Sequence, residues 1–194
     1  MEPDEELQRL KRELTVYLRY DINLPLPDHA ILELLSIIRR TSAHNSLEKW
    51  KHSLISMGIV CLGNRMRPTQ SGALTAAQSE ALFALNEYST SSIPDIAGAA
   101  AHSLGMLKRR EGIPAILRVI ENDSFVDDQS HLITVRGIAF RALLRIEPQL
   151  AREAIRARAR QEYLWASKTG DVQPPQIFSV NWTKSLLCSM RGWS

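Results

Sequence analysis

The sequence predicts an all-α fold in which about four antiparallel helix pairs stack into an α-solenoid. The main observation is a set of four apolar residues that returns after thirty-nine positions with the same spacing of i, i+4, i+8 and i+11. The first set is Ile96, Ala100, Leu104 and Leu107, and the second is Val135, Ala139, Leu143 and Ile146. This spacing places each set on one face of an α-helix. A fainter third copy lies forty-two residues upstream, where Leu54, Gly58, Leu62 and Gly63 match Ile96, Ala100, Leu104 and Gly105. A period near forty residues that contains only helix is typical of a stacked helical array.

The length of 194 residues suits a single domain over residues 1–194, or four helical hairpins of about forty residues each. A helix at 4–20 is expected to cap the N-terminal end. The expected helical pairs occupy residues 28–63, 75–109, 112–147 and 148–190, and a linker or extended loop is expected at 167–177.

Three helices are expected in the N-terminal part of the chain. Residues 4–20 carry one apolar stripe with charged residues opposite, and the Leu-Pro-Leu-Pro stretch at 24–27 ends this helix because proline does not fit a helix interior. A second amphipathic helix is expected at 28–40. Asn45 and Glu48 have capping-box spacing before the third helix. The expected apolar face of the third helix holds Leu47, Trp50, Leu54, Met57 and Cys61.

The middle of the chain predicts a loop at 63–72 and then two helices. Thr75 and Gln78 have capping-box spacing at the start of the first one. The second helix, over 95–109, carries the first apolar set, and this set follows Asp95, a residue type that suits an N-cap.

The C-terminal part continues the same pattern. The stretch Gly-Ile-Pro at 112–114 ends one helix and starts another, because proline is tolerated in a first turn. The second apolar set lies in a helix expected over 132–146, with Thr134 as its N-cap. A further helix is expected at 148–165 and a short last one at 178–190. The segment 178–194 is expected to cap the open end of the array, with a dimer contact as the alternative.

Composition restricts the cellular setting and the chemistry. The chain begins with an acidic stretch rather than a secretory leader, and no apolar run approaches the twenty residues needed to cross a bilayer. We therefore expect a soluble, cytoplasmic protein with no membrane contact. Cys61 and Cys188 lie far apart in apolar surroundings and are expected to be buried thiols. A formal charge of +3 is too small to require a nucleic-acid partner.

The layout resembles the HEAT and HEAT-like repeat family, most clearly over residues 75–160 and more weakly over 28–63. This resemblance implies a right-handed solenoid in which two antiparallel helices form each unit. The family often carries an Asp before the second helix of a unit and an Arg just inside it. Asp95 matches the first of these and Arg136 the second, but neither unit has both. A continuous ladder of charges is therefore not expected, and an isolated contact between Asp95 and Arg136 is left open.

No catalytic or metal-binding motif is found, and we expect neither enzymatic activity nor a cofactor. The five histidines show no HExxH spacing, and no His-Glu pair of the kind used by the iron-dependent HEAT-like hydroxylases is present. Asp123, Asp127 and Asp128 miss the spacing of an EF-hand and are interpreted as part of a solvated loop. The sequence contains no glycine-rich phosphate loop, nucleophile elbow or CxxC.

The most distinctive polar feature is basic. Between Leu132 and Trp165 there are seven arginines against three glutamates. Arg141 and Arg145 are one helical turn apart and project away from the apolar stripe. In the family that the chain resembles, the second helix of each unit usually lines the concave surface. The resemblance therefore places the following side chains on or beside one groove: His102, Lys108, Arg109, Arg141 and Arg145. The alternative is a solvated face without a ligand.

These observations predict a non-catalytic binding module, such as an adaptor, an assembly factor or an inhibitory partner. Its partner would be a protein with an acidic patch, held by the concave face of helices 46–63, 95–109 and 131–147, because arginine suits a bidentate grip on carboxylates. The alternative is a nucleic-acid-binding or DNA-repair module of the HEAT-like glycosylase type. The modest net charge and the scattered tryptophans favour the protein partner. The oligomeric state is not predicted.

Overall fold

Helices account for most of the residues that the computed structural model describes, namely 3–19, 24–44, 49–66, 72–122 and 135–169. No strand occurs in these ranges, so the prediction of an all-α fold is confirmed for them. The helices are α1 (Pro3–Arg19), α2 (Asp28–Ala43), α3 (Lys49–Arg65), α4 (Ala76–Tyr88), α5 (Pro94–Leu107), a 3-10 turn η1 (Arg110–Gly112), α6 (Ile113–Glu121), α7 (Val135–Ile146) and α8 (Pro148–Thr169). None of them is both long enough and apolar enough to cross a bilayer.

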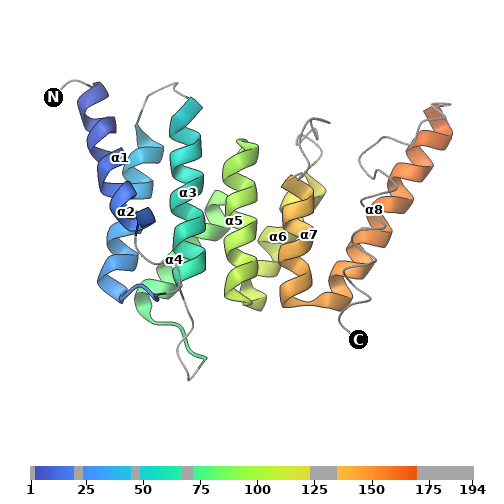
Figure 1. Ribbon diagram of the computed structural model, residues 1–194. Coiled ribbons are helices and arrows are strands. Elements are labelled where there is room, and N and C mark those ends of the chain that lie inside the picture. The colour runs from blue at the N-terminus through green and yellow to red at the C-terminus, as the bar shows by residue number, and fades with distance from the viewer. Residues whose placement is uncertain (1–2, 20–23, 45–48, 67–71, 123–134, 170–194) are drawn as a thin grey trace.

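The three helices α3, α5 and α7 lie side by side in one row (Figure 1), and the most extensive contacts in the structure join α3 to α5 and α5 to α7. Each helix of this row also packs against the helix that precedes it in the chain, which gives the pairs α2–α3, α4–α5 and α6–α7. The helix α1 packs on α2 and α3, and α8 packs on α7. This arrangement is compatible with an α-solenoid.

The repeated apolar set of α5 is fully buried, as its spacing predicts. Ile96, Ala100, Leu104 and Leu107 are each no more than 3% exposed, and Ala139 and Leu143 of α7 are completely buried. The fainter copy on α3 is buried as well. These faces belong to one contiguous cluster of apolar side chains that runs through the described helices.

Small residues allow the helices of the row to approach each other closely. A Cβ atom added to Gly63 of α3 would lie 2.3 Å from the Cβ of Ser103 of α5. A Cβ added to Gly105 of α5 would lie 2.5 Å from the Cα of Ala142 of α7. Ser103 also donates a buried hydrogen bond of 2.9 Å to the carbonyl oxygen of Ile59. The spacing of the row is therefore set by backbone contact at two interfaces.

The predicted capping residues give a mixed result. Thr75 and Gln78 form the expected capping box at the start of α4, so that prediction is confirmed. The prediction that Asp95 is an N-cap is wrong, because α5 begins one residue earlier at Pro94 and takes Ile93 as its N-cap. Proline with its fixed φ is well suited to the first helical position, and Asp95 consequently lies in the first turn.

Two helix ends and the exposure of Met57 also differ from the expectations. The helix α3 continues to Arg65, beyond the start of the predicted loop, while α5 ends at Leu107 because Lys108 adopts a left-handed conformation with φ 52°. Met57, expected on the apolar face of α3, is 51% exposed. The buried face of α3 is centred on Ile55 and Ile59, which are almost completely buried. Met57 therefore points away from the core.

Several expectations concern residues outside the described ranges. These are the capping residues Asn45, Glu48 and Thr134, the apolar residue Leu47, the acidic residues Asp123, Asp127 and Asp128, Cys188, and the segments 170–177 and 178–194. Cys61 is described and buried, as expected.

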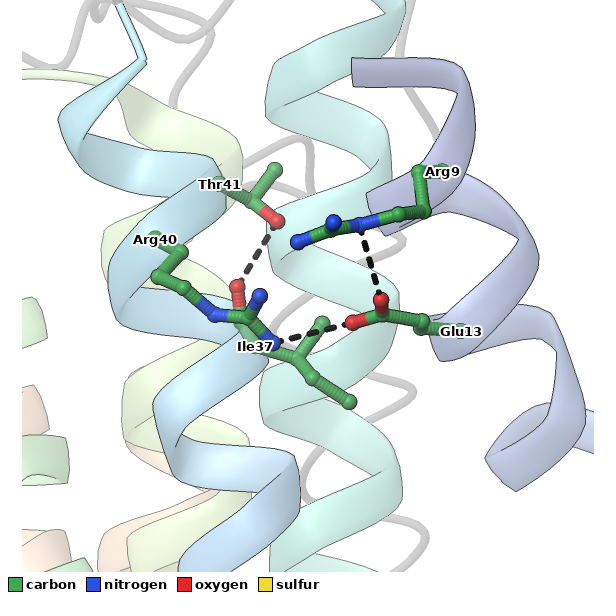
Figure 2. Close-up of polar contacts among 5 residues, drawn as sticks. All are labelled: Arg9, Glu13, Ile37, Arg40 and Thr41. Atoms are coloured by element: carbon green, nitrogen blue, oxygen red, sulfur yellow. Dashed lines mark hydrogen bonds and ion pairs between the residues drawn. The ribbon is translucent and has the colours of Figure 1, made fainter. Parts of the chain in front are cut away.

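An ion pair joins α1 to α2 at the N-terminal end (Figure 2). The carboxylate of Glu13 accepts from Arg9 at 3.1 Å within α1 and from Arg40 of α2 at 2.9 Å. In the residue after Arg40, the hydroxyl of Thr41 donates to the carbonyl oxygen of Ile37, one turn earlier in α2, at 2.8 Å. The charged groups are partly exposed, so each pair contributes at most about 1 kcal/mol, and the buried apolar faces dominate the stability of this end.

The close approach of α5 and α7 leads to a prediction about stability. Gly105→Ala adds a methyl group where the backbone of Ala142 lies, which forces α5 and α7 apart and should destabilise the fold by about 1–3 kcal/mol. The matched control is Gly98→Ala on the same helix, where the nearest atom to the new Cβ is Ile138 Cδ1 at 3.5 Å. This control should be neutral or stabilising by up to about 1 kcal/mol, because alanine has the higher helix propensity. Urea unfolding followed by circular dichroism measures both changes. Equal effects of the two substitutions would contradict the role assigned to Gly105.

Candidate partner-binding groove

A groove of about 770 Å³ runs across the row formed by α3, α5 and α7. All three helices line it, and they are the helices for which the sequence predicts a partner-binding surface. Its lining comes mainly from Ser53, Ser56, Met57, Val60 and Asn64 of α3, from Asp95, Gly98, Ala99 and His102 of α5, and from Val135, Ile138, Arg141 and Arg145 of α7.

The groove exists because α5 presents small side chains between two helices with larger ones. Gly98 and Ala99 of α5 line the middle of the groove, while Met57 of α3 and Ile138 of α7 line it from either side. The half-exposed Met57 is therefore accessible to a ligand. An apolar trough flanked by flexible and branched side chains suits an apolar ligand surface.

Two arginines of α7 supply positive charge to the groove. Arg141 and Arg145 are exposed, and Arg145 lies in the last turn of the helix. Neither takes part in an ion pair with another residue that the structure describes. Elsewhere in the described structure, Arg39 pairs with Glu80 at 2.6 Å and Arg110 with Glu147 at 2.7 Å. The guanidinium groups in the groove are therefore available to an anionic ligand.

His102 lies beside these arginines with its side chain half-buried. Burial lowers the pKa of His102 below the ordinary value of 6.5, and the positive charge of Arg145 lowers this pKa further. The imidazole is therefore neutral near pH 7, where it can donate one hydrogen bond and accept another. A neutral ring at this position reduces the charge repulsion that three neighbouring cations would otherwise create.

Arg65, which also lines the groove, has a structural role. Its guanidinium donates to the carbonyl oxygens of Leu24 at 2.9 Å and Tyr17 at 3.2 Å, and so ties α3 to the segment before α2 and to α1. The neighbouring thiol of Cys61 is buried, which raises its pKa above the ordinary value, while Arg65 opposes this shift. A thiol with a raised pKa is a poor nucleophile at neutral pH.

The structure brings together three of the five residues that the sequence predicts for the binding site. His102, Arg141 and Arg145 all line the groove, whereas Lys108 and Arg109 do not. Lys108 is exposed at the left-handed C-cap of α5. Arg109 is half-buried and donates to the carbonyl oxygen of Gly72, which directs its guanidinium to the connection before α4.

Sequence reasoning missed the apolar and acidic residues of the groove. Met57 was assigned to the core, and Ile138 and Asp95 were not assigned to the site. A signal was present in α5, where Asp95, Ala99 and His102 recur at helical spacing on the face beside the apolar stripe. The sequence does not give the positions of α3 and α7 relative to α5. Those positions decide which residues of α3 and α7 form the walls of the groove beside this face of α5.

The contact between Asp95 and Arg136, which the sequence left open, is not among the ion pairs of the described residues. Asp95 is exposed and lines the groove. Arg136 is buried and donates to the carbonyl oxygen of Asn122 at 2.9 Å, so it ties the start of α7 to the end of α6. In the described part of the chain, no group of three or more His, Cys, Asp or Glu side chains is arranged to hold a metal ion.

Comparison of the chain with protein-family models, curated proteins and solved structures finds no match. The geometry of the groove is therefore the basis for assigning a function.

The lowered pKa of His102 leads to a prediction about pH. The unfolded chain binds a proton at His102 more readily than the folded protein does, so this residue favours folding above pH 6.5 and opposes it as the pH falls toward the lower folded-state value. Wild-type protein should therefore lose more stability than His102→Gln between about pH 7.5 and 5.5. Urea midpoints at the two pH values measure the difference. Parallel losses in the two proteins would show that His102 is equally easy to protonate in both states.

Proposed function

We propose that this protein is a non-catalytic binding module that holds an acidic segment of another protein in the groove across α3, α5 and α7. The observation that carries the proposal is the position of Arg141 and Arg145, two exposed arginines beside an apolar trough without an ion-pair partner among the described residues. Arginine binds carboxylates through two parallel hydrogen bonds, and a neighbouring apolar surface excludes water from such contacts.

A protein segment fits the groove better than a nucleic-acid backbone does. Nucleic acid would present regularly spaced phosphates along the whole groove. Asp95 and the apolar residues Met57 and Ile138 form part of its lining, and they offer no favourable contact to a phosphate. A protein segment with a carboxylate at one position and an apolar surface at the next would complement both the arginines and the apolar residues of the lining.

The all-helical architecture supports an interaction role of the kind served by HEAT-like solenoids. Such arrays present an extended surface built by successive helices, and the groove uses one helix from each of three successive pairs. An adaptor, an assembly factor or an inhibitory partner of a larger protein would each use the surface in this way. We include the right-handed HEAT-like solenoid in the proposal as its structural basis.

Charge reversal in the groove tests the proposal. Arg141→Glu combined with Arg145→Glu should reduce the recovery of partner proteins by at least about tenfold, because two attractive contacts become repulsive. The measurement is affinity purification with quantitative mass spectrometry, followed by cross-linking to locate the bound segment. That segment should be acidic. The helical circular dichroism should remain unchanged, since both side chains are exposed.

The matched control is Arg152→Glu combined with Arg156→Glu, which makes the same change in net charge on exposed residues of α8 outside the groove. This variant should recover the partner as the wild type does. Equal losses in both double variants would indicate a non-specific effect of charge and contradict the proposal. Salt-sensitive retardation of duplex DNA by the wild type, lost in the groove variant, would instead favour a nucleic-acid partner.

A further inference from the structure

The charges of the groove are separated along its length. Asp95 lies in the first turn of α5, and Arg145 lies in the last turn of α7. Gly98 approaches Val135 and Ile138, whereas Gly105 approaches Ala142, so α5 and α7 run in the same direction. The carboxylate is therefore at the end where both helices begin, and the guanidinium groups are toward the end where α7 finishes.

The separation corresponds to a few turns of helix. Since Gly105 is level with Ala142, Arg145 is level with a position about thirteen residues beyond Asp95, or about 20 Å at the rise of an α-helix. Arg141 is one turn closer. The middle of the groove between these charges is apolar, with Met57 on one side and Ile138 on the other. This order of charge, apolar surface and opposite charge matches one face of an amphipathic helix of three to four turns.

Helix dipoles decide the direction of such a ligand. A helix is most stable with acidic side chains in its first turn and basic side chains in its last turn. Placing that acidic first turn on Arg141 and Arg145 makes the ligand antiparallel to α5 and α7. Its positive N-terminus then lies by the negative C-terminal end of α7, and its last turn lies by Asp95. The side-chain charges and the dipoles of both partners thus favour the same orientation.

We propose that the groove binds an amphipathic helix of the partner protein, about thirteen residues long and antiparallel to α5 and α7. Acidic residues in its first turn contact Arg141 and Arg145, its apolar face covers the trough, and a basic residue in its last turn contacts Asp95. This inference rests on the proposed function and specifies the form and the direction of the acidic segment.

Two synthetic peptides of identical composition test the direction. The first carries three glutamates in its first turn, leucine and alanine at i, i+3, i+4 and i+7 in the middle, and three lysines in its last turn. The second exchanges the glutamates with the lysines. Fluorescence anisotropy with labelled peptides should give a Kd about tenfold lower for the acid-first peptide, because three partly exposed ion pairs and the peptide's own dipole favour it.

A charge-inverted protein provides the matched variant. Asp95→Arg, Arg141→Asp and Arg145→Asp change only exposed side chains, so the helical circular dichroism should persist. In this variant the preference should reverse, and the base-first peptide should bind more tightly. A photoreactive group at the N-terminus of the acid-first peptide should cross-link wild-type protein near residues 141–145 rather than near 94–98.

Equal affinity of the two peptides, absence of binding by both, or an unchanged preference in the inverted protein would overturn the inference. The proposed function is tested separately by partner recovery with the Arg141→Glu and Arg145→Glu variant. Loss of recovery there, together with equal peptide affinities, would leave an acidic partner in the groove but reject the antiparallel helix.

Discussion

The structure depends on the close packing of α5 against α3 on one side and α7 on the other. At each interface a glycine of one helix meets a small residue of the next, Gly63 with Ser103 and Gly105 with Ala142, at distances that leave no room for another carbon atom. Glycine in a helix interior costs about 1 kcal/mol relative to alanine. That cost is offset because close backbones bring the flanking apolar faces into contact, so that Ile96, Ala100 and Leu104 are almost completely buried. The buried hydrogen bond from Ser103 to the carbonyl oxygen of Ile59 satisfies the hydroxyl that Ser103 places between α3 and α5.

The same helix shapes the groove. On its faces toward α3 and α7, the small residues of α5 permit close packing, and on its open face Gly98 and Ala99 leave a depression between Met57 and Ile138. Packing and site are therefore linked, because the distance between the two walls of the groove is fixed by the contacts of Gly63 and Gly105. A change that separates the helices would widen the groove even if no lining residue were altered.

The features that are best predicted from the sequence are those that follow from the periodic spacing of its apolar residues. The apolar sets led by Ile96 and Val135 gave the positions of two helices and their buried faces, because helix geometry converts spacing directly into a shared face. Thr75 and Gln78 identified a helix start, since their capping box is a local interaction. Asp95 was misassigned because Pro94 competes for the beginning of the helix. Met57 was misassigned because the core-facing side of α3 depends on neighbours distant in sequence. Arg109 could not be distinguished from Arg141 by sequence, because only the folded chain places the carbonyl of Gly72 beside it.

The electrostatics of the groove are consistent with a site that is completed by a ligand. Burial is the main cause of the low pKa of His102, and the positive charge of Arg145 lowers this pKa further because it opposes protonation of the imidazole. A carboxylate placed between these groups would reverse that effect, because it favours the protonated imidazole as well as the two guanidinium groups. The charge of a bound carboxylate would therefore raise the pKa of His102 and link binding to proton uptake, against the opposing effect of further burial of the imidazole. A phosphate or a carboxylate would both produce this linkage at the cationic end. At the other end of the groove, the carboxylate of Asp95 repels an added anion and attracts a lysine. The opposite charges at the two ends of the groove therefore favour a helix with one acidic and one basic end over a uniform polyanion.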